Sequence, residues 1–316
     1  MSVDRSGGTP GPLVIVGPTA SGKSSLAVDV ARRVGDAEIV SADAMAVYRG
    51  MDIGTAKPTA DERGGVVHHL LDEAEVSEDF TVARFASRVA EVIDDIESRA
   101  RRVVVVGGTG LYVRAVVDDF DVPPRYPELR ASFEADPDLA ALHRRLTELD
   151  PEAAAKILPT NRRRIVRALE VCVGSGRPFS SYGPGIDHYG PTRFRLAGLD
   201  IDRDLMDRRI DERYDRQLDA GFVDEVAGLL ETGLSPTAAQ ALGYRELAAH
   251  LRGETSLDEA VDEAKRRTRR FARRQQRWFR RDPRIRWFPV GSRDLVDDVV
   301  AWWTNPDADC PSELRD

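Results

Sequence analysis

The feature that most constrains this 316-residue chain is a glycine-rich segment near its N-terminus. The segment fits the pattern G-x-x-x-x-G-K-[ST] and consists of Gly17, Pro18, Thr19, Ala20, Ser21, Gly22, Lys23 and Ser24. An apolar run at residues 13–16 precedes it and a helical pattern from residue 25 follows it, which is the context that a phosphate-binding loop needs. The alternative is a chance glycine turn before a buried helix. The segment therefore predicts a site for a di- or triphosphate, or for a ligand that carries a pyrophosphate.

Each part of this P-loop has a physical role in holding phosphate. The glycines let the backbone turn sharply, so that several N–H groups point at one anion, and the helix N-terminus adds partial positive charge. Lys23 is expected to reach a terminal phosphate. The Ser24 hydroxyl is expected to ligate a magnesium ion that the phosphates share. The loop alone does not identify the ligand.

Composition limits the class of protein. Apolar residues make up 41% of the chain, and the two cysteines, Cys172 and Cys310, form no C-x-x-C pair. That usage argues against a disulfide scaffold or a zinc site and is typical of a reducing cytosol. Residues 1–12 lack the apolar core of a signal peptide, and no apolar run approaches the roughly 20 residues of a membrane span. We therefore predict a cytoplasmic protein with a loose N-terminal tail.

The apolar pattern predicts an α/β fold with a parallel sheet. Strands are expected at residues 13–16, 37–43, 102–106, 194–201 and 286–288. Helices are expected at residues 80–101, 204–218, 222–230, 239–251 and 257–281. Four consecutive valines from residue 103 indicate a central strand that is buried on both faces.

Proline-rich, short helical stretches from about residue 118 indicate a mainly helical insertion in a P-loop NTPase-like core. The predicted domains are the first part of the core, the insertion, the second part of the core and an acidic tail, at residues 1–117, 118–194, 195–292 and 293–316. We expect the insertion to contact nucleic acid through the arginines at 162, 163, 164 and 167. A solvated helix face is the alternative.

Two side chains are expected at the carboxyl ends of strands, where ligands bind in open α/β sheets. Asp43 follows the second strand and should share a crevice with the P-loop, although it could instead cap the next turn or hold a magnesium-bound water. Thr109 follows the valine strand within Gly-Gly-Thr-Gly. A Walker-B strand would carry a carboxylate there, so this sequence counts against a motor-type or hydrolytic NTPase.

The segment between the second and third of these strands predicts a loop and no metal site. Residues 45–58 contain several turn-forming residues and little periodicity, and a loop of that length is typically functional. His68 and His69 follow without a third ligand at metal spacing. We interpret them as core or surface histidines.

The formal net charge of −8 by itself argues against binding to nucleic acid, but the last long helix of the chain favours it. It carries ten cations in the 17 residues 265–281, interleaved with Phe271, Trp278 and Phe279. An all-round basic helix has no core-packing explanation, and arginines with aromatics are typical of nucleic-acid contact. The alternative is a solvent face whose arginines pair with the many carboxylates.

Together these segments resemble the bacterial tRNA dimethylallyltransferases. The resemblance extends from residue 13 to about 290 and rests on residues 17–24, 40–43, 48–58, 107–112, 167–170, 243–245 and 273–275. It implies transfer of a dimethylallyl group from dimethylallyl diphosphate to N6 of the adenosine at tRNA position 37, next to the anticodon. It also implies a magnesium ion, bound pyrophosphate rather than ATP, and an insertion that grips the anticodon arm.

The resemblance and the chemistry together assign roles to residues. Asp43 is expected to take the proton of the adenine amine, and Thr109 to hydrogen-bond the base or the substrate. Lys23 would stabilise the leaving pyrophosphate, with Arg209 and Arg213 as further candidates. Contacts to tRNA are expected at Asp43, Ala44, Met45, Ala46, Thr109, Arg163, Arg164, Ile165, Val166, Arg167, Gly243, Tyr244, Arg245, Arg273, Arg274 and Gln275.

Two other classes remain open. A small-molecule kinase would use Lys23 and Ser24 on ATP and Asp43 on a hydroxyl, but it leaves the basic helix unexplained. A non-catalytic RNA-binding P-loop protein would explain the arginines but not a carboxylate facing the phosphate loop. The expected partners are tRNA and dimethylallyl diphosphate, without a membrane, and the expected state is a monomer.

Overall fold

The computed structural model describes residues 10–118, 122–183 and 185–305. The chain divides into two compact units, one made of residues 1–117 and 191–316 and the other of residues 118–190. The second unit begins where the insertion is expected and ends four residues earlier than residue 194. Cys310, the tail beyond residue 305 and most of the expected N-terminal tail lie outside the described residues.

The first unit contains one parallel six-stranded sheet of order β3-β2-β4-β1-β5-β6. Its strands are β1 (Leu13–Val16), β2 (Ala37–Ser41), β3 (His68–His69), β4 (Arg102–Gly107), β5 (Arg195–Asp200) and β6 (Ile285–Pro289). β1 lies between β4 and β5, so it is buried on both faces, which explains its unbroken apolar run. The five predicted strands are confirmed. The two-residue strand β3 was not predicted.

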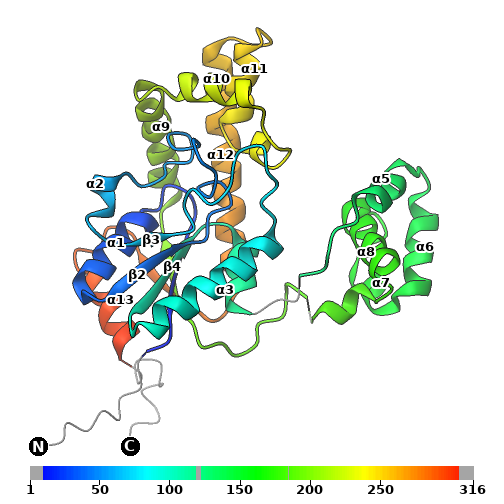
Figure 1. The fold of residues 1–316 in the computed structure, drawn as a ribbon, viewed down its shortest axis with the longest axis horizontal. Coiled ribbons are helices and arrows are strands. Elements are labelled where there is room, and N and C mark those ends of the chain that lie inside the picture. The colour runs from blue at the N-terminus through cyan, green and yellow to red at the C-terminus, as the bar shows by residue number, and fades with distance from the viewer. Residues whose placement is uncertain (1–9, 119–121, 184, 306–316) are drawn as a thin grey trace, which may run out of the picture. The chain divides into compact units, whose positions relative to one another are not determined.

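Helices cover both faces of the sheet (Figure 1). The helices beside the strands are α1 (Lys23–Val34), α2 (Ala60–Arg63), α3 (Val82–Ser98), α4 (Gly110–Val117) and α13 (Leu295–Thr304). Alternate strand residues face α1 and α13 on one side and α3 and α4 on the other. The segment expected to be an acidic tail contains the helix α13. Its Trp303 side chain is completely buried and donates its indole N–H to the carbonyl of Gly11 at 2.8 Å.

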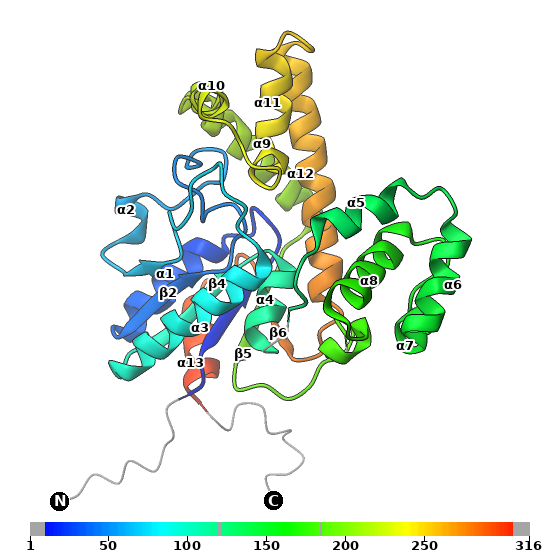
Figure 2. The same cartoon turned by 45° about the vertical axis from the view of Figure 1, so that its right-hand side comes forward.

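Four helices stand together beyond the carboxyl ends of the strands (Figure 2). They are α9 (Arg203–Asp219), α10 (Phe222–Thr232), α11 (Tyr244–Leu251) and α12 (Leu257–Phe279). The predicted helix over 239–251 was wrong in extent. A short 3₁₀ turn, Ala238–Gln240, comes first, and Gly243 then adopts φ +88° before α11 begins at Tyr244. Among the described residues, none of these or the other helices is long and apolar enough to cross a membrane.

Helix α12 is not basic all round, which corrects the sequence-based expectation. One face is buried and consists of Ala260, Val261, Ala264, Thr268, Ala272, Gln275 and Phe279. Many of its cations pair with carboxylates of neighbouring segments: Lys265 with Asp215, Arg267 with Glu246, Arg269 with Asp211, Arg273 with Asp207 and Arg280 with Asp200. The small residues between the arginines thus pack against the rest of the first unit. The alternative stated above, that the arginines of this helix pair with carboxylates, describes much of its surface.

The second unit is helical, as predicted. It contains α5 (Pro127–Ala135), α6 (Leu139–Leu149), α7 (Pro151–Lys156), α8 (Arg162–Ser175) and a 3₁₀ turn, Phe179–Tyr182. Asp138, Asp150 and Asn161 cap α6, α7 and α8 by accepting backbone N–H groups. Its own core is formed by side chains of α5 to α8 such as Leu146 and Ile165, which are completely buried.

Candidate active site

The P-loop has the backbone geometry of an anion site. Helix α1 begins at Lys23, directly after Gly22 at φ +89°, and Ala20 takes φ +64°, which is rare for a residue with a side chain. The first N–H groups of a helix, here those of Lys23, Ser24 and Ser25, have no partner within the helix. Gly22 has no side chain to cap them. Left-handed residues in a loop before such a terminus form a concave nest of N–H donors.

Lys23 is the cation of this nest. Its Nζ lies 3.5 Å from the carbonyl oxygen of Pro18, which is a long hydrogen bond. Loss of surrounding water lowers the pKa of Lys23 to about 8, while the Asp43 carboxylate acts to raise it and the Arg213 guanidinium acts to lower it. Lys23 is therefore mostly charged at neutral pH. Among the described residues, the ammonium donates one hydrogen bond, the long one to Pro18.

Two glycines, Gly17 and Gly108, allow the P-loop and the turn after β4 to pack closely around Ser21 and Lys23. A Cβ on Gly17 would lie 2.8 Å from the Ser21 Oγ, and one on Gly108 would lie 3.4 Å from the Lys23 Cε. The Ser21 side chain is buried, and its hydroxyl has no hydrogen-bond partner among the described residues. Gly108 brings the turn that carries Thr109 against the P-loop. Thr109 itself is half-buried at the start of α4, where its carbonyl accepts the N–H of Val113 at 3.0 Å.

Three side chains fix the tip of the P-loop. Gln275 of α12 accepts the backbone N–H of Thr19 at 2.9 Å, and Arg213 of α9 donates to the Thr19 Oγ1 at 3.1 Å. Arg209 donates to the carbonyl of Ala20 at 3.4 Å. Both arginines predicted for the diphosphate thus lie at the loop and contact its atoms. Whether they also contact a diphosphate stays a prediction.

Asp43 lies where the sequence places it, and it also forms the predicted structural cap. Its Oδ1 accepts the backbone N–H groups of Met45 at 2.8 Å and Ala46 at 3.3 Å. Its Oδ2 has no hydrogen-bond partner among the residues that the structure describes. The carboxylate interacts electrostatically with both Lys23 and Arg213. The cap therefore holds one oxygen and leaves the other available at the P-loop.

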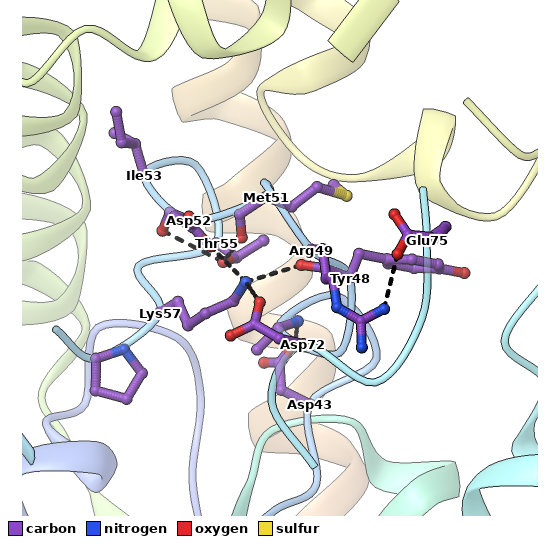
Figure 3. Close-up of polar contacts among 12 residues, drawn as sticks. Asp43, Tyr48, Arg49, Met51, Asp52, Ile53, Thr55, Lys57, Asp72 and Glu75 are labelled. Carbon is purple, nitrogen blue, oxygen red and sulfur yellow. Dashed lines mark hydrogen bonds and ion pairs between the residues drawn. The ribbon is translucent and has the colours of Figure 1, made fainter. Parts of the chain in front are cut away.

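A second lysine organises the segment after Asp43, as Figure 3 shows. The buried Lys57 donates to the Tyr48 carbonyl at 2.8 Å, to the Asp72 Oδ1 at 2.6 Å and to the Asp52 Oδ1. The backbone also pairs residues 46–49 with residues 72–74. The loop predicted at residues 45–58 is thus confirmed, and its conformation is fixed by a buried ion-pair network.

Glu225 of α10 holds the middle of the same loop. Its carboxylate accepts the N–H groups of Asp52, Ile53 and Gly54 at 2.9, 2.7 and 3.1 Å, together with the Tyr244 hydroxyl at 2.6 Å. Burial and this carboxylate raise the pKa of Tyr244. Arg213 then joins the loop to the P-loop, because its second nitrogen donates to the Gly54 carbonyl at 3.1 Å.

Sequence reasoning assigned no role to Lys57 or Glu225. Lys57 lies in the segment 48–58 that carries the family resemblance, so a signal was present. Glu225 gave no local signal, because its partners in the loop lie about 170 residues away in the chain.

The residues predicted to contact tRNA differ in how exposed they are. Arg163, Arg164, Arg245 and Arg274 are exposed. Ile165 and Val166 are completely buried in the second unit's core, and Tyr244 and Gln275 are buried in the first unit. These four side chains thus pack inside the protein, and contact of their residues with tRNA stays a prediction.

The remaining predicted contacts differ in what holds them. Arg167 donates to the carbonyls of Pro123 and Pro124, and Arg273 pairs with Asp207 at 2.6 Å. Gly243 is buried, while Ala44 and Met45 are half-buried beside Asp43. Their contact with RNA stays a prediction.

Comparison with known proteins identifies the family. The family model described as IPP transferase matches residues 46–282. The tRNA dimethylallyltransferase of Thermobifida fusca is 50% identical over 300 residues, which span 92% of this chain and 93% of that protein. The protein of the same name from Streptomyces coelicolor is 50% identical over 290 residues, spanning 90% and 92%.

Solved structures agree with the sequence relatives. The tRNA isopentenylpyrophosphate transferase of Bacillus halodurans has a TM-score of 0.69 at 38% identity and covers 93% of this chain and 95% of its own. A eukaryotic dimethylallyltransferase acting on tRNA has a TM-score of 0.74 at 25% identity, covering 94% and 76%. The P-loop fold, the motif segments and these relatives lead to one conclusion: the chain belongs to the IPP transferase family.

Proposed function

We propose that this protein transfers a dimethylallyl group from dimethylallyl diphosphate to a tRNA, at N6 of the adenosine at position 37. Family membership supports the reaction class, and relatives at about 50% identity carry the name tRNA dimethylallyltransferase. One observation in the site carries the proposal. The P-loop follows β1 and Asp43 follows β2 in the same parallel sheet, so a proton acceptor lies at the sheet edge that carries the phosphate-binding motif, where it interacts electrostatically with Lys23.

The P-loop binds the donor's diphosphate. The N–H groups at the start of α1 and the Lys23 ammonium face an anion there, with Arg209 and Arg213 at the loop. When the bond between the allylic carbon and the diphosphate oxygen breaks, its electron pair stays on that oxygen. Lys23 stabilises the charge that develops, which is the usual large term in such a reaction.

The acceptor amine reacts on the same carbon. The N6 lone pair forms the new C–N bond, and the amine then loses a proton. Asp43 takes that proton on the oxygen that does not cap the turn. General-base catalysis of this kind contributes roughly 10²–10⁴-fold to a rate. Asp43 serves as a catalytic residue, and Thr109 is proposed to hydrogen-bond the base or the substrate.

A magnesium ion fits this site if most of its ligands come from the substrate diphosphate and water. The described residues contain no group of three or more His, Cys, Asp or Glu side chains that could hold a metal ion. Ser24, the second residue of α1, is exposed and offers one hydroxyl. Magnesium usually keeps several waters and binds through substrate phosphates with few protein ligands. Ser24 would therefore hold the ion together with the diphosphate oxygens, and the ion would neutralise leaving-group charge.

The acceptor RNA binds to exposed arginines. Arg245 and Arg274 of the first unit and Arg163 and Arg164 of the second are exposed. Arginines that neutralise phosphates release counterions, so tRNA affinity is expected to fall steeply with salt. We further propose that the protein acts in the cytoplasm as a monomer.

The kinase alternative receives no support from the relatives, which are named as tRNA transferases. The test of the proposed roles is Asp43→Asn, assayed by transfer of labelled dimethylallyl to an unmodified tRNA. Turnover should fall by roughly 10²–10⁴-fold while the Kd for tRNA stays within twofold. Loss of tRNA binding together with turnover would show that Asp43 shapes the fold of the site rather than accepting the proton.

A further inference from the structure

We propose that Gln275 is a positioning residue that fixes the P-loop against the turn carrying Thr109, and that it does not contact tRNA. The inference rests on the proposed function, because it concerns the geometry of the donor site. It differs from the role expected from the sequence, where Gln275 stands beside arginines on a helix with a basic surface.

Both ends of the Gln275 amide are used inside the protein. Its Oε1 accepts the N–H of Thr19 at 2.9 Å, and its Nε2 donates to the carbonyl of Gly108 at 2.8 Å. The two partners follow β1 and β4, which are neighbours in the sheet. A side-chain amide can donate and accept at once, so one residue joins both loops.

The space around this amide leaves little room for movement. A Cβ on Gly108 would lie 2.5 Å from the Gln275 Nε2 and 3.3 Å from the carbonyl oxygen of Gly17. A Cβ on Gly110 would lie 2.2 Å from the Nε1 of Trp278, one turn further along α12. The glycines therefore let α12 lie directly on the turn, and Gln275 is 7% exposed.

The position of Thr19 matters for the donor because Thr19 lies within the anion nest. Without Gln275, the Thr19 N–H and the Gly108 carbonyl would both lose this partner, and of the three side chains that fix the P-loop tip only Arg209 and Arg213 would remain. The loss of buried hydrogen bonds costs about 1–3 kcal/mol, and a loop that is not preorganised binds and stabilises charge less well. The effect should therefore appear on the donor side of the reaction.

The test uses Gln275→Met, which keeps the volume but cannot form either hydrogen bond. Gln276→Met is the matched control, since Gln276 is the neighbouring glutamine and donates to the Ile201 carbonyl at 3.0 Å, away from the P-loop. Pyrophosphate affinity is measured by calorimetry with magnesium, tRNA affinity by filter binding without donor, and kcat and KM by transfer assay. Gln275→Met should weaken pyrophosphate binding on the order of tenfold and leave the tRNA Kd within twofold.

A second variant covers the case in which Gln275→Met does not fold. Gln275→Glu keeps the acceptor for Thr19 but places a second oxygen opposite the Gly108 carbonyl. A protonated carboxyl could donate to that carbonyl, so the loss of pyrophosphate affinity relative to wild type should shrink as pH falls from 8 to 6. A purely structural defect would not show this pH dependence.

Weaker tRNA binding with unchanged pyrophosphate affinity would overturn the inference and assign Gln275 to the RNA surface. Equal effects of Gln275→Met and Gln276→Met would overturn it as well. Failure of the proposed function is distinguishable, because pyrophosphate binding needs no transfer. A wild-type protein without transfer would still allow the affinities of the variants to be compared.

Discussion

Two lysines near the candidate site, Lys57 and Lys23, differ in how fully their charge is paired within the protein. Lys57 is bound by two carboxylates and a backbone carbonyl (Figure 3). Lys23 has one long contact, to the Pro18 carbonyl at 3.5 Å, and its pKa is lowered to about 8. A satisfied cation holds a structure together, whereas a desolvated cation with few partners gains most when an anion arrives. We therefore expect Lys57 to serve mainly as a structural lysine, called the scaffold lysine below, and Lys23 to serve in binding and catalysis.

The largest expected effect in this comparison is that of Lys23→Met on activity. Removal of a cation that stabilises the leaving diphosphate should lower kcat/KM on the order of 10²–10³-fold. The midpoint of urea unfolding should not decrease, because the substitution removes a desolvated charge with one weak contact. Transfer assays and urea titrations on the same preparation check both parts. A large loss of stability would show that Lys23 is structural after all.

Lys57→Met should reverse this pattern. The substitution leaves two carboxylates and a carbonyl without their shared donor, and it should destabilise the protein by about 2 kcal/mol. The estimate is below that for a fully buried pair, because the side chains of Asp52 and Asp72 are 59% and 42% exposed. The matched control is Lys156→Met, which removes an exposed pair with Glu152 and should cost about 0.5 kcal/mol or less. Similar losses for the two variants would remove the distinction between the scaffold lysine and a surface lysine.

The pH dependence of donor binding sharpens the comparison further. Because the pKa of Lys23 in the free protein is lowered to about 8, its charge is present below pH 8 and is lost as pH rises through that value. Pyrophosphate affinity should therefore fall by about tenfold between pH 7 and pH 9, as the charged fraction drops by that factor. Calorimetry at constant ionic strength measures it. Lys23→Arg, which keeps its charge, should bind with little change over the same range.

The smallest expected effect concerns the exposed arginines. Arg274→Ala should weaken tRNA binding by a few fold and lower the slope of log K against log salt by about one, while pyrophosphate affinity stays unchanged. Arg33→Ala is a suitable control, because Arg33 is 61% exposed on α1 and pairs with Asp297. Binding titrations at four salt concentrations would provide the slopes. Equal slopes for Arg274→Ala and the wild type would remove Arg274 from the RNA surface.

The parts of the fold that depend on local sequence could be predicted. The P-loop, the five longer strands and the position of Asp43 after β2 follow from motif and periodicity within short windows. The contacts of Glu225 with residues 52–54 could not be predicted in this way, because about 170 residues separate the partners. The partners of Lys57 lie within 15 residues, but they belong to irregular segments whose contacts follow no periodic pattern. Glu225 accepts from residues 52–54, which are distant in the chain and carry no pattern that points to it.

Helix α12 shows why the surface was harder to predict than the core. Its arginines dominate its composition, while its buried face is made of alanines, a threonine and a glutamine among larger apolar residues. Small and polar core residues give a weak apolar signal, so the helix seemed basic on every side. Several of the carboxylates that neutralise it come from other elements, such as Asp211 of α9 and Glu246 of α11.

The most direct test of the central claim asks which phosphate compound the P-loop serves. Purified wild-type protein is given magnesium, an unmodified tRNA and either dimethylallyl diphosphate labelled in the prenyl group or ATP labelled in the γ-phosphate. The account predicts prenyl label in the tRNA and release of diphosphate, with no dependence on ATP. Transfer or release of the ATP phosphate without prenyl label in the tRNA would contradict it and make the protein a kinase that shares the fold.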